Sequence, residues 1–81
     1  MNIRIQNLPA DVTVEEVREF IGASDEIEKI VLGDPGDDDN VIAVIKVNTS
    51  QAGANAMAEH IDGRFFKERR LSAQALGLLT D

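Results

Sequence analysis

The sequence is 81 residues long, 43% hydrophobic and 28% charged, which is ordinary for one globular domain and argues against disorder. It contains no cysteine, so disulfides, thiolate nucleophiles and cysteine-ligated zinc are excluded. Its 15 acidic and 8 basic residues give a net charge of −7, which disfavours indiscriminate attraction to nucleic acid or anionic membranes. We find no apolar run long enough for a signal peptide or a membrane span, and we therefore expect a cytoplasmic protein.

The chain opens with a predicted strand and a predicted helix. Residues 2–8 alternate apolar and polar side chains, as a half-buried strand does, and the inward set is Ile3, Ile5 and Leu8. Residues 11–22 predict a helix that begins with a capping box, because Thr13 is followed three positions later by Glu16. The apolar side chains of this helix recur at helical spacing: Val14, Val17, Phe20 and Ile21.

Two further strands are predicted on either side of an acidic turn at residues 34–39. The second strand covers residues 26–33, with Ile30 and Leu32 inward and Lys29 and Val31 outward. The third covers residues 40–47, NVIAVIKV, and both of its faces are mostly apolar: Val41, Ala43, Ile45 and Val47 on one, and Ile42, Val44 and Lys46 on the other. A domain of this size has one core, so the second face needs another explanation.

A second helix and a last strand complete the chain. Residues 49–62 predict a helix capped by Thr49 or Ser50, with an apolar stripe of Ala54, Met57, Ala58 and Ile61. Residues 64–76 predict a tight reversal around Lys67 and Glu68, followed by a strand. In that strand the inward residues are Leu71, Ala73 and Ala75, and the outward residues are Ser72 and Gln74.

The element order is strand, helix, strand, strand, helix, strand. Two right-handed βαβ units predict an α+β, ferredoxin-like plait: a four-stranded antiparallel sheet with both helices on one face. We expect this domain to span residues 1–76, with a short apolar tail at residues 77–81. The opposite sheet face is then open, and it carries Arg4, Gln6, Lys29, Val31, Ile42, Val44, Lys46, Ser72 and Gln74.

The open face is predicted to be mildly basic although the protein is acidic. It receives Arg4, Lys29 and Lys46 and no acid from the middle of a strand. A cluster of cations is expected at the rim of the sheet: Arg64, Lys67, Arg69 and Arg70. Such a surface is the best candidate for function. The alternative is an ordinary solvent-exposed sheet, which also favours Lys, Arg and β-branched residues.

Three segments match a known pattern: IRIQNLP at residues 3–9, NVIAVIKV at residues 40–47 and HIDGRFFKERRLSA at residues 60–73. Together they resemble an RNA recognition motif (RRM), and the resemblance spans almost the whole sequence. It implies that the open sheet face binds single-stranded RNA, with aromatic side chains of the first and third strands stacking on bases.

The positions at which that family stacks bases carry other residues here. Arg4 stands at the first-strand aromatic position, and Ile42 and Val44 stand at the two third-strand aromatic positions. Asn40 replaces the basic residue that opens the third-strand octamer, and Val41 replaces its glycine. Aliphatic side chains lack the flat π surface that contributes roughly 1–3 kcal/mol per base, so RNA binding is expected to be weak or non-standard.

We therefore predict a non-enzymatic domain that binds single-stranded RNA through its open face. The predicted RNA-binding residues are Arg4, Gln6, Lys29, Ile42, Val44, Lys46, Gln74, Arg64, Arg69 and Arg70. The alternative is a protein–protein interaction module that uses the aliphatic part of that face or the acidic helices. The apolar end of the chain either covers the aliphatic patch, docks on a partner or completes the core, through Leu76, Leu78 and Leu79.

No cofactor or metal is predicted. His60 is the only histidine and has no cysteine near it, so a transition-metal site is improbable. The aspartates after Leu32 lack the spacing and the closing glutamate of an EF-hand. One histidine and no cysteine also leave little for nucleophilic catalysis.

Overall fold

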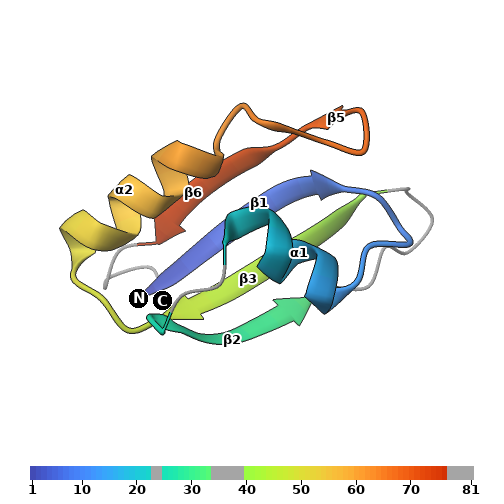
Figure 1. The fold of residues 1–81 in the computed structure, drawn as a ribbon. Coiled ribbons are helices and arrows are strands. Elements are labelled where there is room, and N and C mark those ends of the chain that lie inside the picture. The colour runs from blue at the N-terminus through green and yellow to red at the C-terminus, as the bar shows by residue number, and fades with distance from the viewer. Residues whose placement is uncertain (23–24, 34–39, 77–81) are drawn as a thin grey trace.

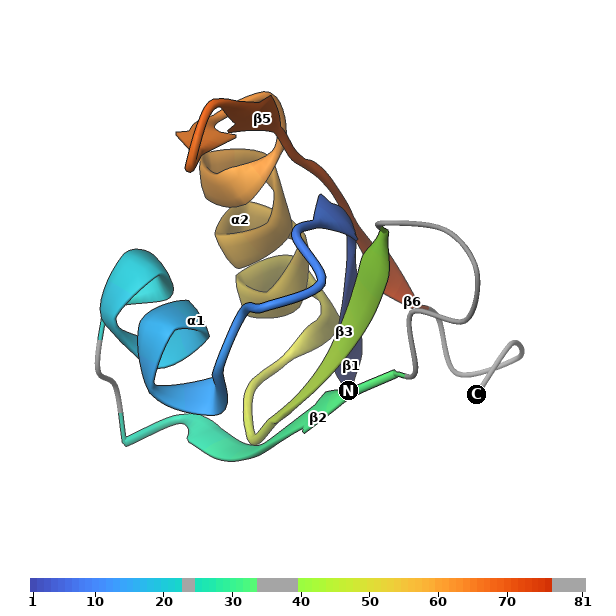
Figure 2. The same ribbon diagram turned by 90° about the vertical axis from the view of Figure 1, so that its right-hand side faces the viewer.

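Four strands form one antiparallel sheet, and two helices lie on one of its faces, as Figure 1 shows. The computed structural model describes residues 1–22, 25–33 and 40–76; the turn predicted at 34–39 and the tail predicted at 77–81 lie outside them. The sheet has the order β2-β3-β1-β6 and consists of β1 (Asn2–Leu8), β2 (Ile27–Leu32), β3 (Val41–Val47) and β6 (Ser72–Leu76). The helices are α1 (Val14–Ile21) and α2 (Gln51–Ile61), and a separate ribbon consists of β4 (Phe65–Phe66) and β5 (Arg69–Arg70). The edge-on view in Figure 2 places both helices on the same side, which confirms the predicted ferredoxin-like plait.

The two central strands supply much of the core. In β1, Ile3 and Ile5 are fully buried, and they pair with Ile45 and Ala43 of β3, which are fully buried as well. On the other side of β3, Ile42 is 44% exposed. The alternation predicted for NVIAVIKV is therefore confirmed, and its second apolar face is open to solvent.

A bulge near the end of β1 keeps Leu8 in the core. The pairing of β1 with β3 shifts register between Ile5 and Leu8, and Asn7 adopts a positive φ of 75° there. Asparagine tolerates this left-handed conformation better than most residues do. The extra residue turns Leu8 inward, and Leu8 is buried as the sequence predicts.

A second bulge lies in β2 and departs from simple alternation. Counting back by twos from the buried Ile30 would place Glu28 in the core. Instead the register shifts between Ile27 and Lys29, so that Ile27 is buried and Glu28 is exposed. An unpaired carboxylate is costly to bury, and the bulge replaces it in the core by an aliphatic side chain.

Both helices begin at polar caps. The Thr13 hydroxyl accepts from the backbone N–H of Glu16, and the Glu16 carboxylate accepts from the Thr13 N–H, which completes the predicted capping box. In α2 the cap is Ser50, whose hydroxyl accepts from the Gly53 N–H at 3.1 Å. The α2 face that packs on the sheet consists mainly of small side chains: Ala54, Ala58 and Ile61 are buried.

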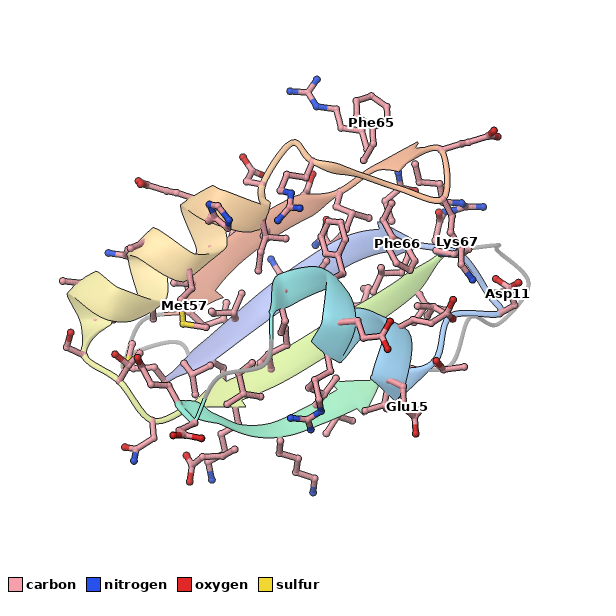
Figure 3. The ribbon with its side chains drawn as sticks, viewed as in Figure 1. Asp11, Glu15, Met57, Phe65, Phe66 and Lys67 are labelled. Atoms are coloured by element: carbon pink, nitrogen blue, oxygen red, sulfur yellow. The ribbon has the colours of Figure 1, made fainter. Side chains whose placement is uncertain are left out.

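The β4–β5 ribbon is a tight hairpin packed against α1. Its turn residues, Lys67 and Glu68, have φ values of 50° and 68°, as a two-residue hairpin turn requires, so the predicted reversal is confirmed. Phe66 meets Phe20 of α1 edge to face with ring centroids 5.2 Å apart. Figure 3 shows Phe65 pointing away from the molecule, and this side chain is 68% exposed.

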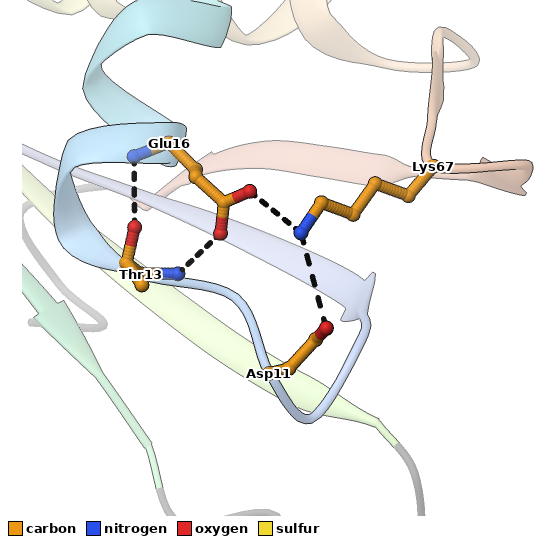
Figure 4. A network of polar contacts seen from close by, with 4 residues as sticks. All are labelled: Asp11, Thr13, Glu16 and Lys67. Atoms are coloured by element: carbon orange, nitrogen blue, oxygen red, sulfur yellow. Dashed lines mark hydrogen bonds and ion pairs between the residues drawn. The ribbon is translucent and has the colours of Figure 1, made fainter.

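Polar contacts fasten the same hairpin to the start of α1, as Figure 4 shows. The Lys67 Nζ atom lies 2.6 Å from Glu16 Oε2 and 3.9 Å from Asp11 Oδ1. The hydrogen bond from Lys67 lowers the pKa of Glu16 below its ordinary value, and the same bond raises the pKa of Lys67. One carboxylate thus caps the helix and holds the hairpin.

Candidate nucleic-acid interface

The open face of the sheet presents its side chains in rows that cross the strands. The central row contains Val31, Val44, Arg4 and Gln74, since each of these residues pairs with the next across β2, β3, β1 and β6. One neighbouring row contains Lys29, Lys46, Asn2 and Leu76, which pair in the same way. On the other side of the central row, Gln6 of β1 pairs with Ser72 of β6.

Outside the row that contains Lys29 and Lys46, this face is divided into an apolar half on β2 and β3 and a polar half on β1 and β6. On β2 and β3, Val31 is 47% exposed, Ile42 is 44% exposed and Val44 is half-buried. On β1 and β6, the side chains are those of Arg4, Gln6, Ser72 and Gln74, which line a hollow of about 240 Å³. Arg4 Nη2 donates a hydrogen bond to Gln74 Oε1 at 3.3 Å, so that the two side chains lie together in the polar half.

Positive charge on the face comes from Arg4, Lys29 and Lys46, as predicted. The exposed lysines lie in one row, and Arg4 stands in the next row, directly opposite Val44. Glu28 is exposed next to Lys29 because of the β2 bulge, and strand alternation alone does not predict this acid at the surface. The charge of the face is therefore positive but modest.

Arg69 extends this surface at the end of the sheet nearest the hairpin. Its Nη1 atom donates to Asn40 Oδ1 at 3.0 Å and to Asn7 Oδ1 at 3.4 Å. Asn7 in turn donates through Nδ2 to the backbone oxygen of Arg70 at 2.9 Å. A second hollow, of about 330 Å³, is lined here by Gln6, Asn7, Asn40 and Ile42. Gln6 is common to both hollows, so they adjoin along β1.

The structure does not bring all the predicted site residues together. The guanidinium carbon of Arg64 lies 4.5 Å from the centroid of the Phe20 ring, so Arg64 packs on α1, in the layer behind the sheet. Arg70 pairs with Phe65 in the hairpin and is exposed there, beyond the rows of the open face. The remaining predicted residues, and Arg69 at the rim, form one surface.

Sequence reasoning did not assign a site role to Asn7, Asn40 or Ser72, which line the hollows. Strand alternation places Asn40 and Ser72 on the outward face, so this signal could have identified them. Asn7 reaches the rim only through its left-handed backbone at the bulge, which no local motif announces.

No group of three or more His, Cys, Asp or Glu side chains in residues 1–22, 25–33 and 40–76 is placed to hold a metal ion. Neither α1 nor α2, the helices of this described part, has the length and apolar character needed to cross a membrane.

Comparison with known proteins gives structural neighbours only. No family model matches the sequence, and no curated protein matches it. The Pes4 RRM3 structure has a TM-score of 0.79 at 18% sequence identity, over 94% of this chain and 90% of that chain. A structure of the Mip6 RRM3 domain has a TM-score of 0.76 at 18% identity, over 90% of this chain and 88% of that chain. A second structure of that domain, at 1.25 Å resolution, has a TM-score of 0.74 at 18% identity, over 90% and 89%. The chain is therefore an RRM-like domain in its fold.

Proposed function

We propose that this domain binds single-stranded RNA weakly through the open face of its sheet and catalyses no reaction. The observation that carries the proposal is the placement of Arg4, Lys29 and Lys46 on one face that the described residues leave uncovered. Phosphates are attracted to these cations, while bases can pack on the exposed side chains of Ile42 and Val31. The RRM fold of the structural neighbours supports the same reading.

The affinity is expected to be low because the face offers no aromatic ring. Base stacking on an aromatic side chain contributes roughly 1–3 kcal/mol per base. The three positions at which RRM domains stack carry Arg4, Ile42 and Val44. Each 1.4 kcal/mol is about a factor of ten in Kd, so two or three absent contacts weaken binding by several powers of ten. The guanidinium plane of Arg4 can recover part of one contact by stacking on a base.

The test is a titration of the ¹⁵N-labelled protein with mixed short single-stranded RNAs at low salt. We expect backbone shifts in β1, β3 and β6, centred on Arg4 and Val44. A Lys29→Gln, Lys46→Gln double variant should bind more weakly, whereas Glu15→Gln on α1, which also changes one exposed charge, should bind as the parent does or slightly better. If saturating RNA moves no resonance of these strands, the proposal is wrong.

A second candidate function is docking of a protein partner on the apolar half of the face. It is favoured by the exposure of two large aliphatic side chains on adjacent strands, Val31 at 47% and Ile42 at 44%. Sedimentation velocity separates the two functions when self-association is the mode. A concentration-dependent dimer that Ile42→Ser abolishes, together with indifference to RNA, would favour the protein partner.

A further inference from the structure

The polar half of the open face has an unequal supply of hydrogen-bond donors and acceptors. Arg4 lies at its centre and is paired with Gln74 across the β1–β6 ladder. The bond from Arg4 Nη2 to Gln74 Oε1, 3.3 Å long, uses one of the two lone pairs of the Gln74 amide oxygen. Most of what remains on this pair donates, namely the Gln74 –NH₂ group and the other guanidinium N–H groups of Arg4, beside one lone pair of the Gln74 oxygen. The Arg4–Gln74 pair is therefore rich in donors, and those of Arg4 belong to a charged group.

Two unengaged groups complete the hollow. Within the described part of the chain, the side chains of Gln6 and Ser72 have no hydrogen-bond partner, and both can accept as well as donate. The hollow that these four side chains line measures about 240 Å³. This is below the ~300–1,000 Å³ of pockets for drug-sized ligands, so it suits one base rather than a larger ligand.

We propose that this hollow is a nucleobase subsite that selects guanine, an inference that rests on the proposed RNA-binding function. Guanine presents two adjacent acceptors, O6 and N7, which match the donors of the Arg4–Gln74 pair. Adenine places an amino donor beside N7, so it opposes a donor with a donor. Unpaired cytosine has two adjacent acceptors, N3 and O2, on its Watson–Crick edge, but its amino group is its only donor, whereas guanine offers both N1–H and its 2-amino group. Uracil offers O4 without a second acceptor beside it. The N–H groups on the other edge of guanine meet the free acceptors of Gln6 and Ser72.

Charge complementarity identifies the occupant as part of a nucleic-acid strand. Lys46 and Lys29 lie in the row next to Arg4, about 7 Å away along the strands, where they can meet phosphates flanking the bound base. The Arg4–guanine bonds are charge-assisted and bidentate, which makes them the strongest base contact this face can provide. Specificity then comes from hydrogen bonding in place of stacking.

The experiment is a comparison of four pentanucleotides, UUXUU with X as G, A, C or U, measured by chemical-shift titration at 50 mM salt. We expect the guanine oligomer to bind about tenfold or more tightly than the other three, the range for one bidentate base contact. Its largest shifts should fall on Arg4, Gln6, Ser72 and Gln74. Equal affinities would overturn guanine selection and leave RNA binding intact. If none of the four moves the sheet resonances, the proposed function itself fails.

Variants distinguish base recognition from charge. Arg4→Lys keeps the charge but loses the planar fork, so it should remove most of the guanine preference and leave the other oligomers nearly unchanged. Gln74→Met removes the amide at an exposed position and should reduce the preference without altering any charge. The matched control, Lys46→Gln, should weaken all four oligomers alike. A guanine preference that survives both Arg4→Lys and Gln74→Met would show that another group reads the base, and the assignment to this hollow would be wrong.

Discussion

Replacing Ile42 by phenylalanine should strengthen the RNA binding that we propose for the open face. Ile42 occupies a central strand, is 44% exposed and adjoins the hollow lined by Gln6, Asn7 and Asn40. A phenyl ring at this position can lie along the sheet without entering the core, so we expect little change in the free energy of unfolding. The ring would supply the flat surface that an isoleucine lacks.

The expected gain follows from the energy of one stacked base. At roughly 1–3 kcal/mol per base, Ile42→Phe should lower Kd by about 5- to 150-fold. The control is Ile42→Leu, which keeps an aliphatic side chain of equal size and should leave Kd within about twofold. Fluorescence anisotropy with a labelled single-stranded RNA at 50 mM salt measures both variants. An unchanged Kd in a natively folded Ile42→Phe protein would contradict the placement of bases over β3.

Three further predictions concern charge, packing and pH. If Arg4, Lys29 and Lys46 each neutralise one phosphate of single-stranded RNA, the logarithm of the association constant should fall with the logarithm of salt concentration with a slope of about −2. Raising salt from 50 to 200 mM should then weaken binding about 20-fold. In Lys46→Gln the slope, measured by fluorescence anisotropy, should become shallower by about 0.7. Ile45→Ala should lower the free energy of unfolding in urea by about 2–5 kcal/mol, because Ile45 is fully buried and pairs with Ile3 of β1 and Ile30 of β2. A loss below about 1 kcal/mol would show that the core is loosely packed there. The pKa of Glu16 is lowered below its ordinary value of 4.5 by Lys67, so the stability it contributes is present above pH 4.5 and is lost as pH falls through the folded-state pKa. In thermal unfolding between pH 5 and pH 3, Glu16→Gln should therefore show a smaller fall in Tm than the parent, and equal falls would argue against the Lys67 contact.

The fold was predictable because its signals are local and agree with one another. The capping box at Thr13, the period-two pattern of residues 40–47 and the reversal at Lys67 each specify one element. The order of elements is then compatible with few topologies. Because both helices of such a topology pack on the same face of the sheet, the other face is predicted to be open. Most outward residues could therefore be assigned from alternation alone.

The parts that sequence did not predict depend on contacts between distant residues. The sequence predicts that Arg64 is one member of a basic rim. Its guanidinium instead packs on Phe20, 44 positions earlier in the chain, because the hairpin folds back on α1. The bulge at Glu28 follows from the cost of burying a carboxylate, and no local pattern fixes which residue is skipped. Arg69 contacts Asn7 and Asn40, which the fold brings together from distant parts of the chain.

The segregation of charge makes the proposed binding of a polyanion compatible with a net charge of −7. Glu15, Glu16 and Glu19 lie on α1, on the side of the sheet opposite the open face. The domain measures 21 Å in its smallest dimension, whereas the Debye length is about 8 Å at physiological ionic strength. In the proposed complex, RNA on the open face would therefore be screened from most of the helical acids and would interact mainly with Arg4 and its neighbouring lysines. The screening weakens at 0.01 M salt, where the Debye length is about 30 Å, and the repulsion from those acids then opposes further gains in affinity. We therefore expect net charge to limit RNA affinity at very low salt, and the local arrangement of charges to determine it under physiological conditions.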